Sequence, residues 1–338
     1  MTENKEDIRP EIGEITKPEG IRVFAEAVKE RLLSEDRGFD IGINEYRKNN
    51  GVVCLGLEFR TPGKSMVPIV YLEPFWEAFQ NGTSMEKICA QILGCYEENA
   101  DREPGFDVRD LGDFGKISSR ICYRFVNAEK NREIFRGLPH RPFHDLMIIY
   151  YIPLAQDEEG IASTVVNDTL MEAWGTEEEE LYKLAEKNTP GMFPPVLDIL
   201  ADILRELFPI NAEEEAQHIP MLVGTNSAKM NGASVILYPG LLRSVSERFG
   251  GKSFYILPSS IHEVIFVPEN YRTSADALLD LLRSVNKDAV AEKEFLSDNI
   301  YHYDADTGEL ELIQSYGAEG CGGRRFHEGK FLTYGLAG

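Results

Sequence analysis

Two short segments of the chain combine the side chains that general acid–base chemistry uses. Imidazole, carboxylate and hydroxyl groups are the usual acids, bases and nucleophiles of hydrolases. A fold that brings the two segments together would therefore assemble a catalytic site. The candidate residues are His140, His144 and Asp145 in the first segment and Ser260, His262 and Glu263 in the second.

The first segment invites a metal-site interpretation. Histidines four residues apart share a helix face and can hold a metal ion, with Asp145 as a third ligand or an orienting partner. Pro142 stands between His140 and His144, however, and proline disfavours a continuous helix there. A polar turn into the next strand is the alternative. Walker A, GxGxxG, GxSxG and HExxH motifs are absent from the sequence, so we expect neither a metal nor a cofactor.

The second segment holds a nucleophile, a base and an acid within four residues. Catalytic triads are assembled from distant segments, because adjacent side chains cannot hydrogen-bond in series. On a strand, Ser260 and His262 would share a face and Glu263 would point the other way. We expect His262 at the start of a strand, with its ring near the surface. Glu73, before Pro74, is a further candidate acid or a helix cap.

Composition limits the classes of function. The chain has 338 residues with a formal net charge of −22 and 43% hydrophobic residues. These values are typical of a folded globular protein and argue against direct nucleic-acid binding. The segment 157–215 holds 16 acidic and three basic residues. It predicts a solvated face, a surface for a basic protein partner, or a mimic of DNA.

The sequence also predicts the compartment. Residues 1–20 lack the apolar core of a signal peptide. The longest apolar stretch, Leu146–Leu154, is much shorter than the roughly 20 residues that span a bilayer. The five cysteines form no CxxC pair, which favours buried reduced thiols over a disulfide or zinc framework. We therefore expect a cytoplasmic protein without a membrane segment.

Hydrophobic periodicity predicts an α+β fold with mixed or antiparallel sheets, built of hairpins followed by helices in two lobes. Hairpin-then-helix units are expected at 40–80, 146–174 and 221–249, with a strand at 233–238. A helix is expected over Met192–Phe208. The predicted organisation is a frayed N-terminus at 1–18, lobes at 19–138 and 139–314, and a flexible Gly-rich tail at 315–338.

Six motifs, in order along the chain, resemble those of an uncharacterised bacterial family, domain of unknown function 5688. The resemblance spans roughly Ile21 to Ile313, and the Gly-rich end after Ile313 departs from it. It implies a soluble intracellular protein and carries over no activity or catalytic residue. The motifs are Val70-Tyr-Leu-Glu-Pro-Phe75, Pro139-His-Arg-Pro-Phe-His-Asp-Leu146, Trp174-Gly-Thr-Glu-Glu-Glu-Glu-Leu181, Asn188-Thr-Pro190, Tyr238-Pro-Gly240 and Leu257-Pro-Ser-Ser-Ile-His-Glu-Val264.

The missing motifs and the acidic segment together favour a non-catalytic interaction or regulatory protein with an acidic surface. A protein partner would bind the region 157–215. Two alternatives stay open at this point. One is an acidic mimic of DNA, and the other is a hydrolase whose site is assembled from Glu73, His140, His144 and His262.

Overall fold

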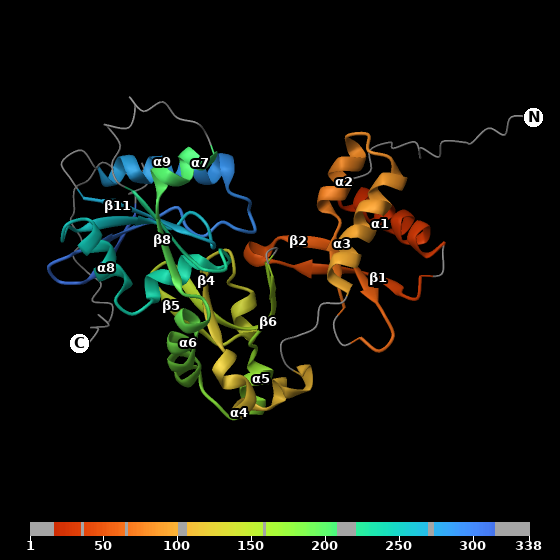
Figure 1. Ribbon diagram of the computed structural model, residues 1–338, viewed down its shortest axis with the longest axis horizontal. Helices are drawn as coiled ribbons and strands as arrows, with labels where there is room; N and C mark the ends of the chain where they lie inside the picture. Colours follow the sequence, from red (N-terminus) through yellow and green to blue (C-terminus); the bar gives the residue numbers. More distant parts are fainter. Residues whose placement is uncertain are drawn as a thin grey trace, which may run out of the picture. The chain divides into compact units, whose positions relative to one another are not determined.

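The structure is a computed structural model in which the chain forms two compact units, Met1–Val108 and Arg109–Gly338 (Figure 1). Both units combine helices with antiparallel sheets, so the predicted α+β class is confirmed. Predictions for residues 1–16 and 315–338 lie outside the described part. The structure describes residues 17–34, 37–64, 67–100, 107–157, 160–207, 221–269 and 274–314.

The division between the units differs from the lobe boundary expected at residue 139. Strand β4 (Cys122–Asn127) pairs along its whole length with β6 (Leu146–Asp157). A boundary at residue 139 would separate these two paired strands. The division at Val108 and Arg109 keeps them in one unit.

The N-terminal unit packs helices on one face of a three-stranded antiparallel sheet of order β1-β2-β3. The hairpin expected within residues 40–80 is confirmed, with its turn at Asn50-Gly51. Both turn residues have the positive φ that such a turn requires, 58° and 72°. The elements are α1 (Lys17–Leu33), β1 (Asp40–Arg47), η1 (Asn49–Gly51), β2 (Val53–Arg60), β3 (Ile69–Tyr71), α2 (Glu73–Gln80) and α3 (Met85–Ala100).

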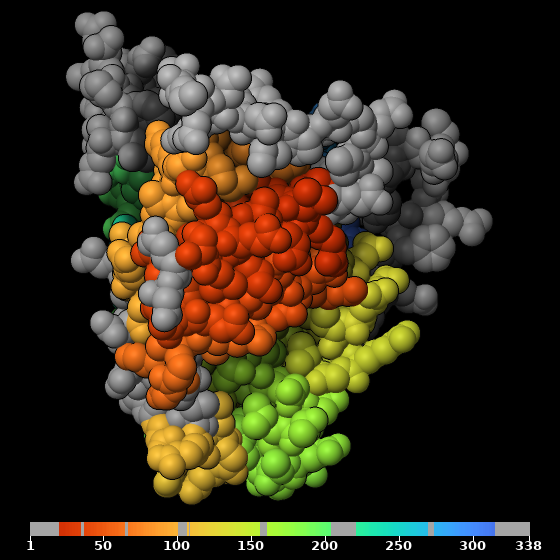
Figure 2. All heavy atoms as spheres, turned by 90° about the vertical axis from the view of Figure 1, so that its right-hand side faces the viewer, coloured from red at the N-terminus to blue at the C-terminus, as the bar shows by residue number. Residues whose placement is uncertain are grey.

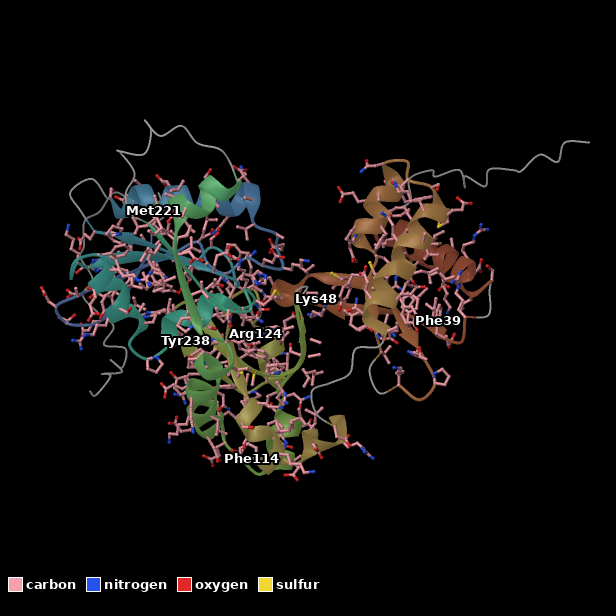
Figure 3. All side chains as sticks on the ribbon, viewed as in Figure 1. Phe39, Lys48, Phe114, Arg124, Met221 and Tyr238 are labelled. Atoms are coloured by element: carbon pink, nitrogen blue, oxygen red, sulfur yellow. The ribbon has the colours of Figure 1, made fainter. Side chains whose placement is uncertain are left out.

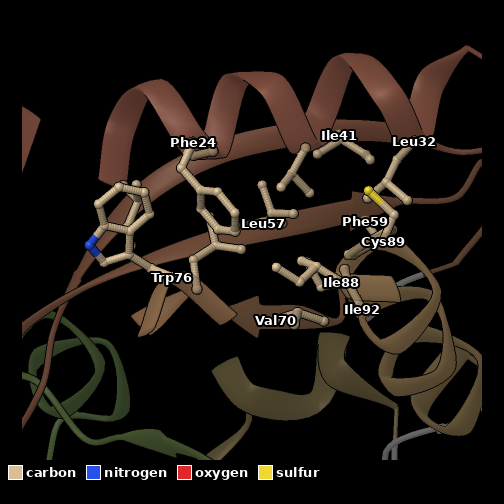
Figure 4. Packing of buried hydrophobic residues seen from close by; sticks show 14 residues of the cluster. Phe24, Leu32, Ile41, Leu57, Phe59, Val70, Trp76, Ile88, Cys89 and Ile92 are labelled. Carbon is tan, nitrogen blue, oxygen red and sulfur yellow. The ribbon is translucent and has the colours of Figure 1, made fainter. Parts of the chain in front are cut away.

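Strand alternation separates the two faces of this sheet. Leu55, Leu57 and Phe59 of β2 point into an apolar cluster that also takes side chains from all three helices (Figure 4). The indole nitrogen of Trp76 points away from the other labelled side chains of that cluster. Figure 2 shows the outer surface of this unit, where the segment containing α1 is red.

The opposite face of the sheet carries a polar cluster centred on Glu58. Its carboxylate accepts hydrogen bonds from the Tyr46 hydroxyl, from Asn44 Nδ2 at 2.6 Å and from the Arg60 guanidinium. The Tyr46 hydrogen bond, followed by those of Arg60 and Asn44, holds the pKa of Glu58 below its usual value.

The lowered pKa of Glu58 predicts a pH-dependent contribution to the stability of the N-terminal unit. A carboxyl whose pKa is lower in the folded than in the unfolded state stabilises fully above the unfolded pKa of about 4.3. We expect urea unfolding to show that Glu58→Gln is less stable than the native chain at pH 7. The difference should shrink as the pH falls below 4.3. Exposed Glu77→Gln is the control, and an equal pH dependence in both variants would contradict the assignment.

The C-terminal unit begins with a four-stranded antiparallel sheet in which β6 is central. Strand β4 lies along one edge of β6, and β5 and then β7 pair with it as well. Helix α6 packs on β4 and β6. The elements are η2 (Val108–Gly112), α4 (Phe114–Ile117), η3 (Ser118–Arg120), η4 (Ile134–Gly137), β5 (His140–Phe143), β7 (Gly160–Val165), α5 (Asp168–Trp174) and α6 (Glu178–Met192).

A six-stranded antiparallel sheet of order β13-β12-β10-β11-β9-β8 forms the rest of this unit. Helix α9 covers one face through Leu279 and Leu282. Phe254, on the other face, contacts Phe249 at the end of α8. The elements are β8 (Pro195–Ile199), α7 (Leu200–Leu207), β9 (Leu222–Asn226), η6 (Gly232–Leu237), α8 (Leu241–Arg248), β10 (Phe254–Leu257), β11 (Val264–Pro268), α9 (Ala275–Ala289), β12 (Ile300–Tyr303) and β13 (Leu310–Ile313).

One sequence prediction in this region is correct only in its second half, and another is wrong. The helix expected over Met192–Phe208 is the strand β8 followed by α7, because Pro195–Ile199 pairs with β9. The strand expected at 233–238 is the 3₁₀ helix η6. Its first five residues are buried, so it fills the interior rather than adding an edge to the sheet.

Gly232 at the start of η6 marks the tightest backbone approach in this region. A Cβ atom there would lie 2.2 Å from Thr225 Oγ1 and 2.4 Å from the His262 carbonyl oxygen. Real Cβ atoms do not come so close to backbone, so the chain has to shift or the residue has to be glycine.

We expect Gly232→Ala to lower the free energy of unfolding by about 3 kcal/mol, because the new methyl group overpacks a buried site. Gly191→Ala in α6 is the matched control in the same unit, since a Cβ atom there meets nothing within 4 Å. The control should be neutral or stabilising by about 0.5–1 kcal/mol. Urea unfolding measures both, and equal stabilities would contradict the packing argument.

Candidate functional site

Most of the buried polar side chains described in the C-terminal unit, together with a few part-buried ones, lie at one end of the six-stranded sheet. There β9 and β10 end and β11 and β12 begin, as the pairing of Val264 with Gly224 and of Ile256 with Tyr301 fixes. We call this region the polar seam. It comprises Asn127, Asp145, Thr225, Asn226, Asn231, Ser260, His262, Asn286, Ser297 and Asn299, together with the backbone they contact.

Asp145 is the most densely bonded carboxylate of the seam. Its Oδ2 accepts from Ser297 Oγ at 2.5 Å and from Asn299 Nδ2 at 2.9 Å, and its Oδ1 accepts from the Tyr301 hydroxyl at 2.5 Å. Burial, followed by the charge of Asp145, raises the pKa of Tyr301 well above its usual value. The phenol therefore stays protonated and remains a donor to Asp145.

His144 forms the tip of the β5–β6 hairpin beside Asp145. Phe143 and Leu146 are paired across the turn, so His144 and Asp145 are its two loop residues. His144 has a positive φ of 52°, a conformation that non-glycine residues seldom adopt. Its ring lies 5.3 Å from the ring of Tyr301. Although the residue is exposed, desolvation by its neighbours lowers the pKa of the ring against the opposing charge of Asp145, which favours the neutral imidazole.

Backbone contacts complete the seam. Asn127 Nδ2 donates to the Leu296 carbonyl at 2.8 Å, and Asn286 Nδ2 donates to the Ser297 carbonyl at 2.8 Å. Asn286 Oδ1 accepts from Ser259 Oγ at 2.5 Å. These amides therefore tie the four-stranded sheet and α9 to the segment that leads into β12.

The serine–histidine–glutamate segment does not form a triad among itself. Ser260 Oγ accepts from the His262 backbone nitrogen at 3.0 Å rather than from the ring. The ring Nδ1 of His262 accepts from the Asn231 backbone nitrogen at 3.3 Å. Glu263 is exposed. His262 is part-buried and stands two residues before β11, so its ring positions the entry to η6.

The other two candidates lie elsewhere. His140 is the first residue of β5 (His140–Phe143), so the segment does not form the helix that a metal site would need. The expected polar turn into the next strand is present at His144 and Asp145. The Nδ1 atom of His140 lies 2.7 Å from the Leu138 carbonyl, and its ring stacks 5.0 Å from Phe135. Glu73 belongs to the N-terminal unit. Its Oε1 accepts from the Leu55 backbone nitrogen at 2.7 Å, which joins the start of α2 to β2.

Sequence reasoning missed a charged cluster on the face of the four-stranded sheet that α6 covers. The Arg141 guanidinium bonds Glu178 at 3.0 and 2.9 Å and also contacts Glu179. The Tyr150 hydroxyl donates to Glu178, and Arg141 lies 4.0 Å from the centre of the Tyr182 ring. Burial and the Glu178 hydrogen bond raise the pKa of Tyr150. Two of the six motifs held the sequence signal for this cluster: one contains Arg141, and the other contains four consecutive glutamates, Glu177 to Glu180.

The described residues provide neither a metal-ligand cluster nor a membrane-spanning helix. In the part of the chain that the structure describes, no group of three or more His, Cys, Asp or Glu side chains is arranged to hold a metal ion. No helix within the described ranges has both the length and the apolarity needed to cross a membrane.

Comparison with known proteins assigns the chain to a family. Residues 21–305 match the model of the Family of unknown function (DUF5688). The chain belongs to this family, and the resemblance noted from its six motifs is confirmed. No curated protein and no solved structure matches the chain.

The bonding of Asp145 predicts that its charge stabilises the C-terminal unit. Asp145→Asn replaces one acceptor oxygen with an NH2 donor, which faces donors from Ser297, Asn299 or Tyr301. We expect a loss of roughly 3 kcal/mol in the free energy of unfolding. Exposed Asp288→Asn on α9 is the control and should stay within about 0.5 kcal/mol of the native chain. If Asp145→Asn were as stable as this control, the charge of Asp145 would not stabilise the unit and the prediction would be wrong.

Proposed function

We propose that this member of the family is a non-catalytic interaction protein that binds a basic protein partner through α5 and α6. The supporting observation is the charge of these two helices. Residues 168–192 hold seven acidic and two basic residues. We call the exposed acids Glu172, Glu177, Glu179 and Glu180 the acidic face.

Little of this acidity is balanced within the described residues. Arg141 bonds Glu178 and Glu179, and Lys183 lies 3.4 Å from Glu179. Glu180 accepts a hydrogen bond from the Thr176 hydroxyl at 2.6 Å, which leaves its charge in place. Three glutamates crowd the first turn of α6, where the helix dipole favours them although they repel one another. A cationic partner would relieve that repulsion.

The state of the candidate catalytic residues supports a non-catalytic role. Asp145, Ser260 and His262 are each held by hydrogen bonds within the seam. A nucleophile needs a base within hydrogen-bond reach, and the Ser260 hydroxyl instead contacts backbone. The acidic DNA mimic and the hydrolase that uses Glu73 with His140, His144 and His262 remain untested predictions.

The proposal is tested by charge reversal on the acidic face. We expect the combined variant Glu172→Lys, Glu177→Lys and Glu180→Lys to bind a fluorescent lysine-rich peptide about tenfold more weakly than the native chain. The affinity of the native chain should also fall with added salt, because exposed charges are screened. Fluorescence anisotropy measures both effects.

A matched control separates a local site from total charge. The combined variant Glu26→Lys, Glu30→Lys and Glu97→Lys changes the net charge by the same amount at exposed positions of α1 and α3. It should bind the peptide within about twofold of the native chain, since long-range charge acts weakly at physiological salt. If both variants lost affinity equally, peptide binding would reflect net charge alone and the assignment to α5 and α6 would be wrong.

A further inference from the structure

Helix α9 carries an apolar stripe that the six-stranded sheet leaves exposed. Leu279 and Leu282 point toward the sheet and are buried. Leu281 and Val285 are 51% and 42% exposed, and their spacing of four residues places them on one helix face. Leu278 lies one turn before Leu281 on that face and is half-buried. Among the exposed large apolar residues of the described ranges, only Leu281 and Val285 are neighbours on a helix, so they form a patch rather than scattered exposure.

The sheet continues this apolar surface beside the stripe. Met221, which precedes β9 and is labelled in Figure 3, packs against the same cluster as Leu278, and so does Ile265 of β11. Val223 of β9 pairs directly with Ile265 and therefore lies on the same face. All three sheet residues are only half-buried, whereas Leu257 of β10, which pairs with Ile265 on its other side, is buried. Helix α9 thus covers β10 and leaves apolar surface over β9 and β11. We call this surface, together with the stripe, the α9 patch.

Two carboxylates border the α9 patch. Asp198 of β8 pairs directly with Val223, so its side chain lies on the same face of the sheet. Asp288 follows Val285 by about one turn of α9. Both carboxylates are exposed, and neither has an ion pair or hydrogen bond with another residue that the structure describes. A segment that covers the patch therefore needs apolar side chains at its centre and basic side chains at its edges.

The chain that follows β13 begins beside this face and has that composition. Ile313, the last residue of β13, packs against the same cluster as Leu279 and Leu282 of α9. Residues 324–332 combine three large apolar side chains with three basic ones, and we call them the tail segment. These side chains are Phe326, Phe331 and Leu332 with Arg324, Arg325 and Lys330.

The tail segment is within reach of the α9 patch. Arg324 follows Gln314 by ten residues, and a chain of that length spans at most about 33 Å. Between β13 and β9 the sheet has four strand spacings, which amount to about 19 Å. The connection is therefore long enough to bring the segment across β12, β10 and β11.

We propose that the tail segment docks on the α9 patch of the same chain. Its apolar side chains cover Leu281 and Val285, which removes apolar area from water, and its basic side chains lie against Asp198 and Asp288. Because the segment is joined to the unit, its effective concentration at the patch is on the order of 1 mM, which favours it over a second copy of the chain. The α9 patch is separate from the acidic face on α5 and α6, so this inference does not rest on the proposed function.

The test measures how fast trypsin cleaves the full chain after Arg324 and Arg325, by mass spectrometry of the intact protein. A docked segment has to detach before a protease can bind it. Leu281→Gln combined with Val285→Gln removes the apolar stripe and keeps good helix formers in α9. We expect this variant to be cleaved about tenfold faster than the native chain, close to the rate of a synthetic peptide of residues 315–338. Asp198→Asn combined with Asp288→Asn should give a smaller increase of about threefold, because it removes charge only.

A matched control and a variant of the tail segment separate docking from other effects. Val23→Gln combined with Leu33→Gln makes the same kind of change at exposed apolar positions of α1 and should leave the cleavage rate unchanged. Phe331→Ser combined with Leu332→Ser changes no residue of the patch and should raise the rate as much as the α9 variant does. Circular dichroism checks that each variant is folded.

Protein concentration distinguishes the tail segment from a second copy as the occupant. Docking within one chain is unimolecular, so the cleavage rate constant of the native chain should stay the same over about a hundredfold range of concentration. Three outcomes would overturn the proposal. They are cleavage of the native chain as fast as the peptide, an unchanged rate in the tail variant or in a folded α9 variant, and protection that increases with concentration, which would place a second copy on the patch.

Discussion

A carboxylate placed at the tip of a hairpin has to be given donors, and Asp145 receives them from three residues around the start of β12. Bonds to an ionised acceptor are stronger and shorter than neutral ones. The contact therefore fixes where the six-stranded sheet begins relative to the four-stranded sheet. The same two-residue turn places His144 in the left-handed backbone conformation. Loss of these hydrogen bonds to Asp145 would free the start of β12 from the β5–β6 turn.

The polar seam gains specificity more than stability from its buried groups. A buried amide costs little when it is fully bonded and a great deal when it is not, so arrangements of these segments that break the bonds are disfavoured. Asn127 bonds the Leu296 carbonyl, and Asn286 bonds both Ser259 and the Ser297 carbonyl. In the sequence, the side-chain types of Asp145, Ser260 and His262 suggest catalysis. In the structure, each of them makes hydrogen bonds that hold neighbouring segments in place.

Local signals in the sequence were sufficient wherever a short segment determines its own shape. Asn50-Gly51 is a dipeptide typical of tight hairpin turns, and it forms the turn between β1 and β2. Asn167 is a residue type typical of helix caps, and its side chain accepts from the Leu170 backbone nitrogen at the start of α5. Residues 195–199 and 232–237 were misassigned because their structure depends on distant partners. β8 needs β9 to become a strand, and η6 needs the cramped space beside Thr225 and His262. Arg124 could not be distinguished from a solvated arginine, since nothing in one sequence shows which strand face is covered.

The acidic helix α6 and Arg141 of the four-stranded sheet are parts of one electrostatic arrangement. Helix α6 places acids at its N-terminus, and only the pair nearest the sheet, Glu178 and Glu179, meets Arg141. Glu178 is therefore a part-buried partner of Arg141, whereas Glu177 remains exposed. On the other face of the same sheet, Arg124 Nε has no hydrogen-bond partner among the described residues. The exposed acids that this arrangement leaves on α5 and α6 form the surface at which we propose that a cationic protein binds.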